Sequence, residues 1–187
     1  AGIGSLDEGS ALLSLQAPTG AVPGYGGLDV TLSATALAEL GDAVLYLVRY
    51  PFECGEQISS RLVVVAALGD MMEALGVTEL ADRAALARFV QEDLRRLAAL
   101  QGAGGGFSFW KRGDPDPFLS VHVAHALVRA RQAGFEPPAG VLDGVGRYLH
   151  SKDGFVPKGT RKDVRLTMEA YALYVRHLLG DDDPDEV

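Results

Sequence analysis

The spacing of apolar residues changes along the chain from every second position to every third or fourth. Residues 1 to 33 contain two short runs of alternating apolar and polar side chains, 11–15 and 28–33, separated by a loop rich in proline and glycine. Two strands alone are marginally stable in water. We therefore expect an extended, β-like N-terminal segment over residues 1–32 that lies on the edge of further structure.

From Ser33 onward the apolar positions follow the three-and-four spacing of amphipathic helices, with capping residues at starts and proline or glycine at ends. The pattern predicts a mainly α domain over residues 33–180, followed by an acidic, disordered tail over 181–187. The predicted helices run from about Ser33 or Thr35 to Pro51, Gly55 or Glu56 to Leu75, Glu79 to Leu100, Pro117 to Gly134, Ala139 to Ser151, and Lys162 to Leu179.

The helical part also contains an internal repeat. Gly105-Gly106-Phe107, a loop, and then Leu119-Ser120 and Ala126-Leu127 recur as Asp153-Gly154-Phe155, a loop, and then Leu166-Thr167 and Ala172-Leu173, at an offset of about 46 to 48 residues. That offset suits a helical hairpin as the repeating unit, with the helices pairing in order into three hairpins. Glycine-aromatic turns before an inner helix resemble those of α/α-toroid proteins. The resemblance implies about half of a full toroid, whose last hairpin has an apolar flank in need of a partner.

Composition narrows the function classes. A chain of 187 residues with 48% hydrophobic content can bury one sizeable core. A net charge of −8 and a pI near 4.9 argue against nucleic acid or an anionic membrane surface as a partner. The longest apolar run, Leu62 to Leu68, is far shorter than the roughly 20 residues of a spanning helix. No signal peptide is visible, and we expect the chain to be a piece of a longer protein.

Two histidines lie three residues apart on the fourth predicted helix, a spacing compatible with two metal ligands. His122 and His125, together with Asp114 and Asp116, nevertheless match no zinc signature. Ordinary interhelical packing or surface placement is the favoured interpretation, and we predict no metal and no cofactor. Core and rim packing is likewise favoured for four aromatic residues, Phe107, Phe109, Trp110 and Phe118.

Cys54 is the single cysteine, so no internal disulfide can form. One interpretation is a buried, inert thiol. Its position between Glu53 and Gly55 at a helix start, rather than on an apolar face, weakens that interpretation. A second is the nucleophile of a Cys-His enzyme, favoured by the positive end of the helix. Such an enzyme needs a histidine partner, and no motif supports any of the four available, His122, His125, His150 and His177.

A third interpretation pairs Cys54 with Gln57, because residues three apart in a first turn share a face of the helix. Attack of the thiol on the Gln57 carboxamide would expel ammonia and leave an internal thioester. Gly55 would relieve backbone strain in the small ring. Glu56 is interpreted as a favourable charge in the first turn rather than a catalytic group. Water must be excluded until the acyl group is needed.

The motif Cys54-Gly55-Glu56-Gln57 resembles the thioester motif of the alpha-2-macroglobulin and complement family. The preceding Tyr50-Pro51-Phe52-Glu53 and the following Ser59-Ser60-Arg61 are similar to those of bacterial alpha-2-macroglobulin-like proteins. Further matches extend the resemblance over most of residues 27 to 180: Gly27-Leu28-Asp29-Val30, Gly105-Gly106-Phe107 with Trp110, and Leu119 to Ala126 after Asp116-Pro117. Cys54 and Gln57 would be the reactive pair, with Pro51, Gly55 and Glu56 as supporting residues.

The resemblance implies a fragment of a protease-trapping inhibitor. In the family, a protease cleaves a bait region, the molecule rearranges, and the thioester captures the protease through a surface lysine. The expected module is therefore a single-turnover inhibitor rather than an enzyme, in a periplasmic, cell-surface or secreted protein of bacterial defence. Its partners would be target proteases and the remaining domains of a parent protein. A helical scaffold without an active thioester, and a Cys-dependent hydrolase or transferase, remain alternatives.

One departure from the family bears on the target nucleophile. Complement members that favour hydroxyl targets carry a histidine downstream of the cysteine, in a loop that corresponds to residues 154–162 here. This chain has no histidine in that stretch, and His150 and His177 lie outside it. The resemblance therefore implies a preference for amines.

Overall fold

The chain divides into two units, Ala1–Ala34 and Thr35–Val187, and each is described by itself. The structure is a computed structural model, and the residues that it describes are 9–12, 14, 16, 19–20, 22, 24, 26–27, 30, 39–73, 75, 77–150 and 155–181.

In the first unit, the described residues lie in turns and irregular backbone. Leu12, Val22 and Val30 are exposed, and several glycines have positive φ. Most residues of the two predicted strand runs, 11–15 and 28–33, lie outside the described residues. The β-like character of the N-terminal segment therefore stays a prediction.

The second unit confirms the mainly α fold class. Its α-helices are α1 (Glu39–Arg49), α2 (Gly55–Leu68), α3 (Arg83–Ala98), α4 (Pro117–Gln132), α5 (Val141–Leu149) and α6 (Lys162–Leu179). No strand occurs within the parts of the chain that the structure describes, apart from an isolated bridge between Gln101 and Phe107. None of the described helices is long and apolar enough to cross a membrane.

The helix boundaries follow the sequence signals closely. Asp116 caps α4 by accepting a hydrogen bond from the Leu119 N–H at 2.8 Å, and Pro117 occupies the first turn. Pro51 follows the end of α1, since the residue before a proline disfavours helical backbone. The predicted caps Ser33 and Thr35 lie outside the described residues, as does the tail beyond Asp181.

Two helix boundaries differ from the prediction by more than two residues. The second helix was expected to reach Leu75, but α2 ends at Leu68 and a 3₁₀ turn, η2 (Gly69–Met71), follows. The third was expected to begin at Glu79, yet a 3₁₀ turn, η3 (Thr78–Leu80), comes first. The helix α3 itself begins at Arg83, where Asp82 caps it by accepting a hydrogen bond from the Ala85 N–H. In both cases the apolar spacing continues beyond the helix, since residues next to the turns such as Met72 and Val77 are also buried in the core. The periodicity therefore marks the buried face and not the extent of the helix.

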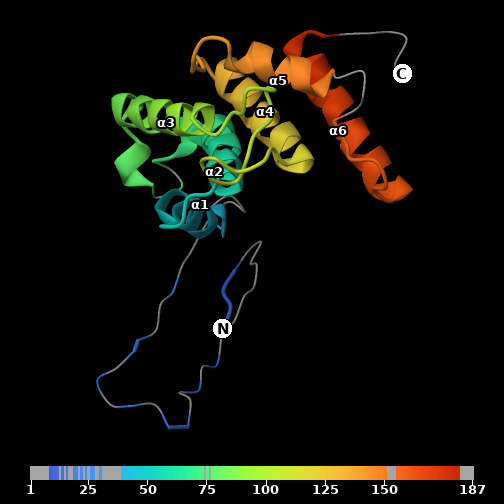
Figure 1. Ribbon diagram of the computed structural model, residues 1–187. Helices are drawn as coiled ribbons and strands as arrows, with labels where there is room; N and C mark the ends of the chain where they lie inside the picture. Colours follow the sequence, from blue (N-terminus) through green and yellow to red (C-terminus); the bar gives the residue numbers. More distant parts are fainter. Residues whose placement is uncertain are drawn as a thin grey trace. The chain divides into compact units, whose positions relative to one another are not determined.

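Helices α2, α4 and α6 form a row with α4 in the middle (Figure 1). The helix α3 packs against α2 and α4, with its larger contact on α2, and α5 packs against α4 and α6. The sequence predicted that the third helix pairs with the fourth. In the structure α3 does contact α4, but its contact with α2 is larger. This arrangement places the start of α2 beside α4 and the 101–116 loop.

The core runs through this row. Leu62 and Val65 of α2 and Leu119 and Leu127 of α4 are fully buried, and Phe107 from the intervening loop joins them. The Phe107 N–H donates to the Ser120 hydroxyl at 2.8 Å, which fixes the loop on α4. The other three aromatic residues, Phe109, Trp110 and Phe118, lie at the rim and are 40 to 60% exposed.

The repeat places equivalent residues in unequal environments. Leu119 and Leu127 of α4 are buried, whereas their counterparts Leu166 and Leu173 of α6 are exposed. The difference arises because α4 lies between two helices, while α6 is the last helix of the row. An apolar flank on α6 is thereby left in contact with solvent.

We predict that Phe107→Ala lowers the free energy of unfolding by about 3–5 kcal/mol, because it empties a fully buried aromatic site. The matched control is Trp110→Ala, three residues on in the same loop, where the side chain is 60% exposed and we expect a change within about 0.5 kcal/mol. Urea denaturation followed by circular dichroism measures both. Equal losses for the two variants would contradict the assignment of Phe107 to the core.

Candidate functional site

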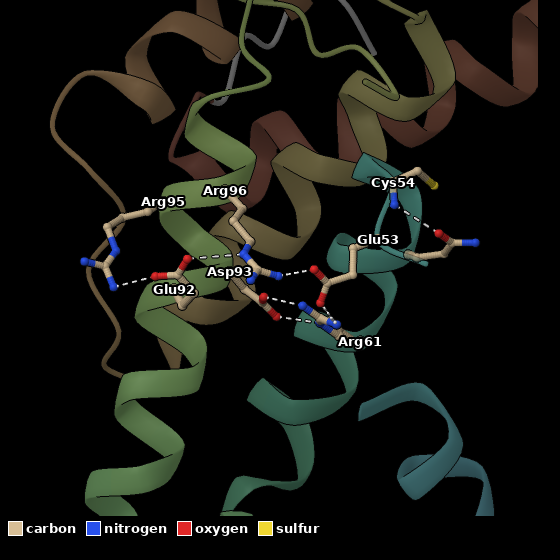
Figure 2. Close-up of polar contacts among 8 residues, drawn as sticks. Glu53, Cys54, Arg61, Glu92, Asp93, Arg95 and Arg96 are labelled. Atoms are coloured by element: carbon tan, nitrogen blue, oxygen red, sulfur yellow. Dashed lines mark hydrogen bonds and ion pairs between the residues drawn. The ribbon is translucent and has the colours of Figure 1, made fainter. Parts of the chain in front are cut away.

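The sequence-predicted pair Cys54 and Gln57 meets at the first turn of α2. Cys54 is the N-cap, with extended backbone (φ −84°, ψ 169°), and Gln57 occupies the third helical position. The two residues form a capping box, in which the Cys54 N–H donates a hydrogen bond to Gln57 Oε1 at 3.0 Å (Figure 2). The side-chain acyl group of Gln57 is thus held against the backbone of Cys54.

Gly55 follows Cys54 where the chain has no room for a side chain. Its N–H donates to the Phe109 carbonyl at 3.0 Å, so the 101–116 loop lies directly on the helix start. A Cβ at this position would lie 3.0 Å from the Ser108 carbonyl oxygen and 3.1 Å from a Leu100 methyl group. Gly55 itself has ordinary helical backbone. Close packing therefore leaves little room for a side chain at Gly55, and its role in relieving strain in a closed thioester ring stays a prediction.

The two members of the pair differ in their access to solvent. Cys54 is buried at 8% exposure, whereas Gln57 is half-buried and lines a cavity of about 210 Å³. The other lining residues are Tyr46, Leu47, Tyr50, Phe52 and Arg61. Pro51, which ends the preceding helix, lies exposed between two of these aromatic residues. The arrangement covers the sulfur and opens the acyl side of the pair onto an aromatic-walled cavity.

The residue before the cysteine is fixed by a buried ion-pair cluster. Arg61, one and a half turns into α2, binds Asp93 of α3 through two hydrogen bonds, of 2.7 and 2.5 Å, and Glu53 at 2.8 Å. Arg96 of α3 also pairs with Glu53, as Figure 2 shows. The Arg61 guanidinium additionally lies over the Phe89 ring. Glu53 is therefore held from both sides, and the start of α2 is fastened to α3.

Burial dominates the electrostatics of this cluster. Arg61 and Asp93 are 4% and 1% exposed. Burial raises the pKa of Asp93, and the Arg61 guanidinium opposes that shift through its hydrogen bonds and charge. A buried pair of this kind is costly to break, because removing one partner leaves the other charge uncompensated. Sequence reasoning included Arg61 in the family resemblance but assigned no role to Arg61 or to Asp93, since charged residues on predicted helices are usually solvated.

A second polar network begins on the other side of the first turn of α2, at Glu56. The Ser60 hydroxyl donates to Glu56 Oε1 at 2.7 Å and lies 2.9 Å from His122 Nε2 of α4. The Tyr171 hydroxyl of α6 lies 3.3 Å from His122 Nδ1 and 2.9 Å from His125 Nδ1. The network therefore connects Glu56 of the tetrapeptide with the other two helices of the row.

Arg129 and the aromatic rings complete this network. Arg129 Nε donates to His125 Nε2 at 3.2 Å, and its terminal nitrogen donates to the Tyr174 hydroxyl at 2.8 Å. The Phe118 ring stacks on His122. Burial lowers the pKa of His122, which the nearby Glu56 charge partly opposes. Burial also lowers the pKa of His125, and Arg129 and His122 add to that shift.

These contacts bear on the alternatives left open by the sequence. Both ring nitrogens of His122 and of His125 are engaged by Ser60, Tyr171 or Arg129, so neither ring has a free nitrogen for the Cys54 thiol or a metal ion. Within the described residues, no group of three or more His, Cys, Asp or Glu is placed to hold a metal. Both histidines make interhelical contacts, which is the placement that the sequence favoured for them.

Ser60 and Tyr171 were missed by sequence reasoning, although the repeat contains a signal for one of them. Tyr171 follows His125 by 46 residues, the same offset that relates Ala126 to Ala172. Equivalent positions lie at the same level of adjacent inner helices in stacked repeats, and here their side chains are in contact. The histidine pair and the tyrosine could therefore have been matched from the repeat register alone.

The sequence of the chain is similar to those of several known proteins. The chain is 28% identical over 162 residues to an alpha-2-macroglobulin homolog of Yersinia pestis, and covers 8% of that protein's length. Relatives named alpha-2-macroglobulin occur in several other bacteria. No family model matches the chain.

Solved structures agree with this result. The region of native Escherichia coli alpha-2-macroglobulin from domain MG7 to the C-terminus matches 81% of the chain with a TM-score of 0.66, at 24% identity and over 24% of its own length. Salmonella alpha-2-macroglobulin reacted with methylamine matches 79% with a TM-score of 0.68, at 22% identity and over 10% of its length. The chain is thus similar in sequence to bacterial alpha-2-macroglobulins and shares a fold with their C-terminal region. The family resemblance inferred from the sequence is confirmed.

We predict that Gly55→Ala lowers the free energy of unfolding by about 1–3 kcal/mol, because the added methyl group meets the Ser108 backbone carbonyl. Gly146→Ala, on α5 with no atom within 4 Å of the added Cβ, is the matched control. It should be neutral or stabilising by up to about 1 kcal/mol. Chemical denaturation measures both variants, and an equally tolerated Gly55→Ala would contradict the close approach of the loop.

The histidine network makes stability depend on pH. The pKa of His122 and that of His125 lie below the ordinary value of 6.5 in the folded state. At a pH between the folded-state pKa of each histidine and 6.5, the unfolded chain binds a proton that the folded chain does not. The contribution to stability is therefore complete above pH 6.5 and falls as the pH drops below it. The free energy of unfolding, measured from about pH 7.5 to 5.5, should fall less steeply for His122→Gln than for the wild type. Parallel curves would contradict the role of His122.

Proposed function

We propose that this chain is the thioester-containing part of a protease-trapping protein similar to the bacterial alpha-2-macroglobulins. Cys54 and Gln57 form an internal thioester, which captures an attacking protease through a surface amine in a single turnover. The geometry at the start of α2 is the observation that supports this proposal most directly. Gln57 Oε1 accepts a hydrogen bond from the Cys54 N–H at the positive end of a helix.

That hydrogen bond supports acyl chemistry at Gln57. Attack on the acyl carbon moves negative charge onto its oxygen, and a donor already aimed at this oxygen stabilises the charge without reorganisation. The Cys54 N–H occupies this position, and the helix dipole has the favourable sign. The Cys54 N–H of the capping box would therefore also stabilise the negative charge that develops on the Gln57 oxygen.

Two acyl transfers follow from this arrangement. In the first, Cys54 Sγ bonds to the Gln57 acyl carbon, the carbon–nitrogen bond breaks, and the carboxamide nitrogen leaves as ammonia with the thiol proton. In the second, an amine nitrogen bonds to the same carbon and the carbon–sulfur bond breaks. Cys54 leaves as a thiolate, the amine proton is lost to a base, and an amide remains on residue 57. One capture consumes the acyl group, so no turnover follows.

The surroundings fit an acyl group that is protected yet reachable. Cys54 is buried beneath the Phe109 loop, and Gln57 faces the aromatic-walled cavity. Aromatic walls suit the alkyl stem and the ammonium of a lysine side chain. Salmonella alpha-2-macroglobulin reacted with methylamine shares this fold, and we extend amine reactivity to this chain by analogy.

The rest of the parent protein is part of the proposal. The exposed apolar residues of α6, Val164, Leu166, Leu173 and Tyr174, suit an α/α-toroid continued by further helical hairpins. The chain spans about 8% of the Yersinia relative, so the bait region and shielding domains would lie in other parts of such a protein. A periplasmic, cell-surface or secreted location and a role in bacterial defence belong to the same proposal.

Intact mass spectrometry tests the proposal. With the thioester formed, the mass should be lower than that encoded by one ammonia, and methylamine should add its own mass while releasing one titratable thiol. Cys54→Ser is the control and should show neither change. The encoded mass with no methylamine reaction would favour a helical scaffold, and repeated turnover of a substrate would favour a hydrolase. Glycerol is offered in parallel, and efficient ester formation would overturn the predicted preference for amines.

A further inference from the structure

The polar network beside the reactive turn has one consistent arrangement of hydrogens when both histidines are neutral. Arg129 can only donate, so His125 Nε2 accepts, and the ring proton of His125 lies on Nδ1. His125 therefore donates to the Tyr171 hydroxyl, which must donate onward to His122 Nδ1. The ring proton of His122 then lies on Nε2 and points to Ser60.

The other end of the network agrees with this direction. The Ser60 hydroxyl donates its one proton to Glu56 Oε1, so it must accept from His122 Nε2. An ionised carboxylate can only accept. The chain of hydrogen bonds thus runs one way, from a cation on α4 through Tyr171 of α6 to the Glu56 carboxylate on α2. Every donor along it has an acceptor.

The last bond of this chain fixes the direction of the Glu56 carboxylate along its helix. Side chains in α-helices lean toward the N-terminus, and a carboxylate in the first turn is attracted by the free N–H groups there. That end of α2 carries Cys54 and Gln57. The bond to Ser60, four residues downstream, instead draws the carboxylate toward the C-terminus and against α4.

We infer that this hydrogen-bond chain is a tether that holds the Glu56 carboxylate away from the Cys54–Gln57 acyl group and so slows its hydrolysis. The inference rests on the proposed function. An untethered carboxylate beside a thioester is a general base for water. Water oxygen bonds to the residue 57 acyl carbon, the carbon–sulfur bond breaks with its electron pair on Cys54, and the water proton passes to Glu56. Ser60, His122 and Tyr171 are positioning residues that prevent this.

Thioester hydrolysis in the absence of amine tests the tether, followed by intact mass and by thiol release. Ser60→Ala removes the hydroxyl bound to Glu56 and should speed hydrolysis by about tenfold, below the roughly 10²- to 10⁴-fold of a well-positioned base. Tyr171→Phe should speed hydrolysis by a smaller factor. Thr167→Ala, which removes an exposed hydroxyl on the same helix that donates to the Asp163 carbonyl, is the control and should hydrolyse at the wild-type rate.

The decisive variant is the double substitution Ser60→Ala with Glu56→Gln. If the freed carboxylate is the base, removing it should return hydrolysis to the rate of Glu56→Gln alone, whereas damage to the fold would not be repaired. Wild-type hydrolysis in Ser60→Ala, or no recovery in the double variant, overturns the tether while leaving the thioester intact. Failure of the proposed function is distinct, because the wild-type mass would then show no thioester.

A second measurement tests the tether without any variant. Nitrogen-15 spectra of the histidine rings should show the proton on Nε2 of His122 and on Nδ1 of His125. The opposite tautomers would overturn the tether, because Ser60 could not then both accept from His122 and donate to Glu56. The measurement needs no thioester, so it applies even if the chain does not form one.

Discussion

The ion pair buried between Arg61 and Asp93 is the constraint on which the site depends. It joins α2 to α3 through two parallel hydrogen bonds, and Arg61 also holds Glu53, the residue before Cys54. Burying these charges is costly, and the geometry recovers that cost only when every partner is in place. The start of α2 consequently has one position and orientation relative to its neighbours.

The 101–116 loop completes this fixation from the opposite side. It reaches the helix start because Phe107 is buried against α4 and because Gly55 offers no side chain to hold the loop away. The loop carbonyl then accepts the Gly55 N–H, one of the donors that a helix start leaves unpaired. The donor of Cys54 is taken by Gln57 instead. Local capping requirements and the proposed chemistry are thus met by the same few atoms.

Charge is distributed around the first turn of α2 in two separate systems. Glu53 faces α3 and pairs with Arg61 and Arg96, whereas Glu56 faces α4 and belongs to the histidine network. Both carboxylates of the turn are therefore occupied by partners, and neither is left free beside the buried cysteine. A thioester needs such surroundings, because stray bases and water shorten its life.

The sequence alone determined the mainly α fold, most helix ends, and the pairing of Cys54 with Gln57 in one turn. These features depend on local rules, namely helical periodicity, capping residues and the spacing of side chains within a turn. Only the tertiary structure decided that Gly55 is needed for packing, that Asp93 is buried, and that Ser60 and Tyr171 meet the histidines. Such contacts join residues far apart in the chain, and their energies depend on which helices lie side by side, which no local pattern specifies.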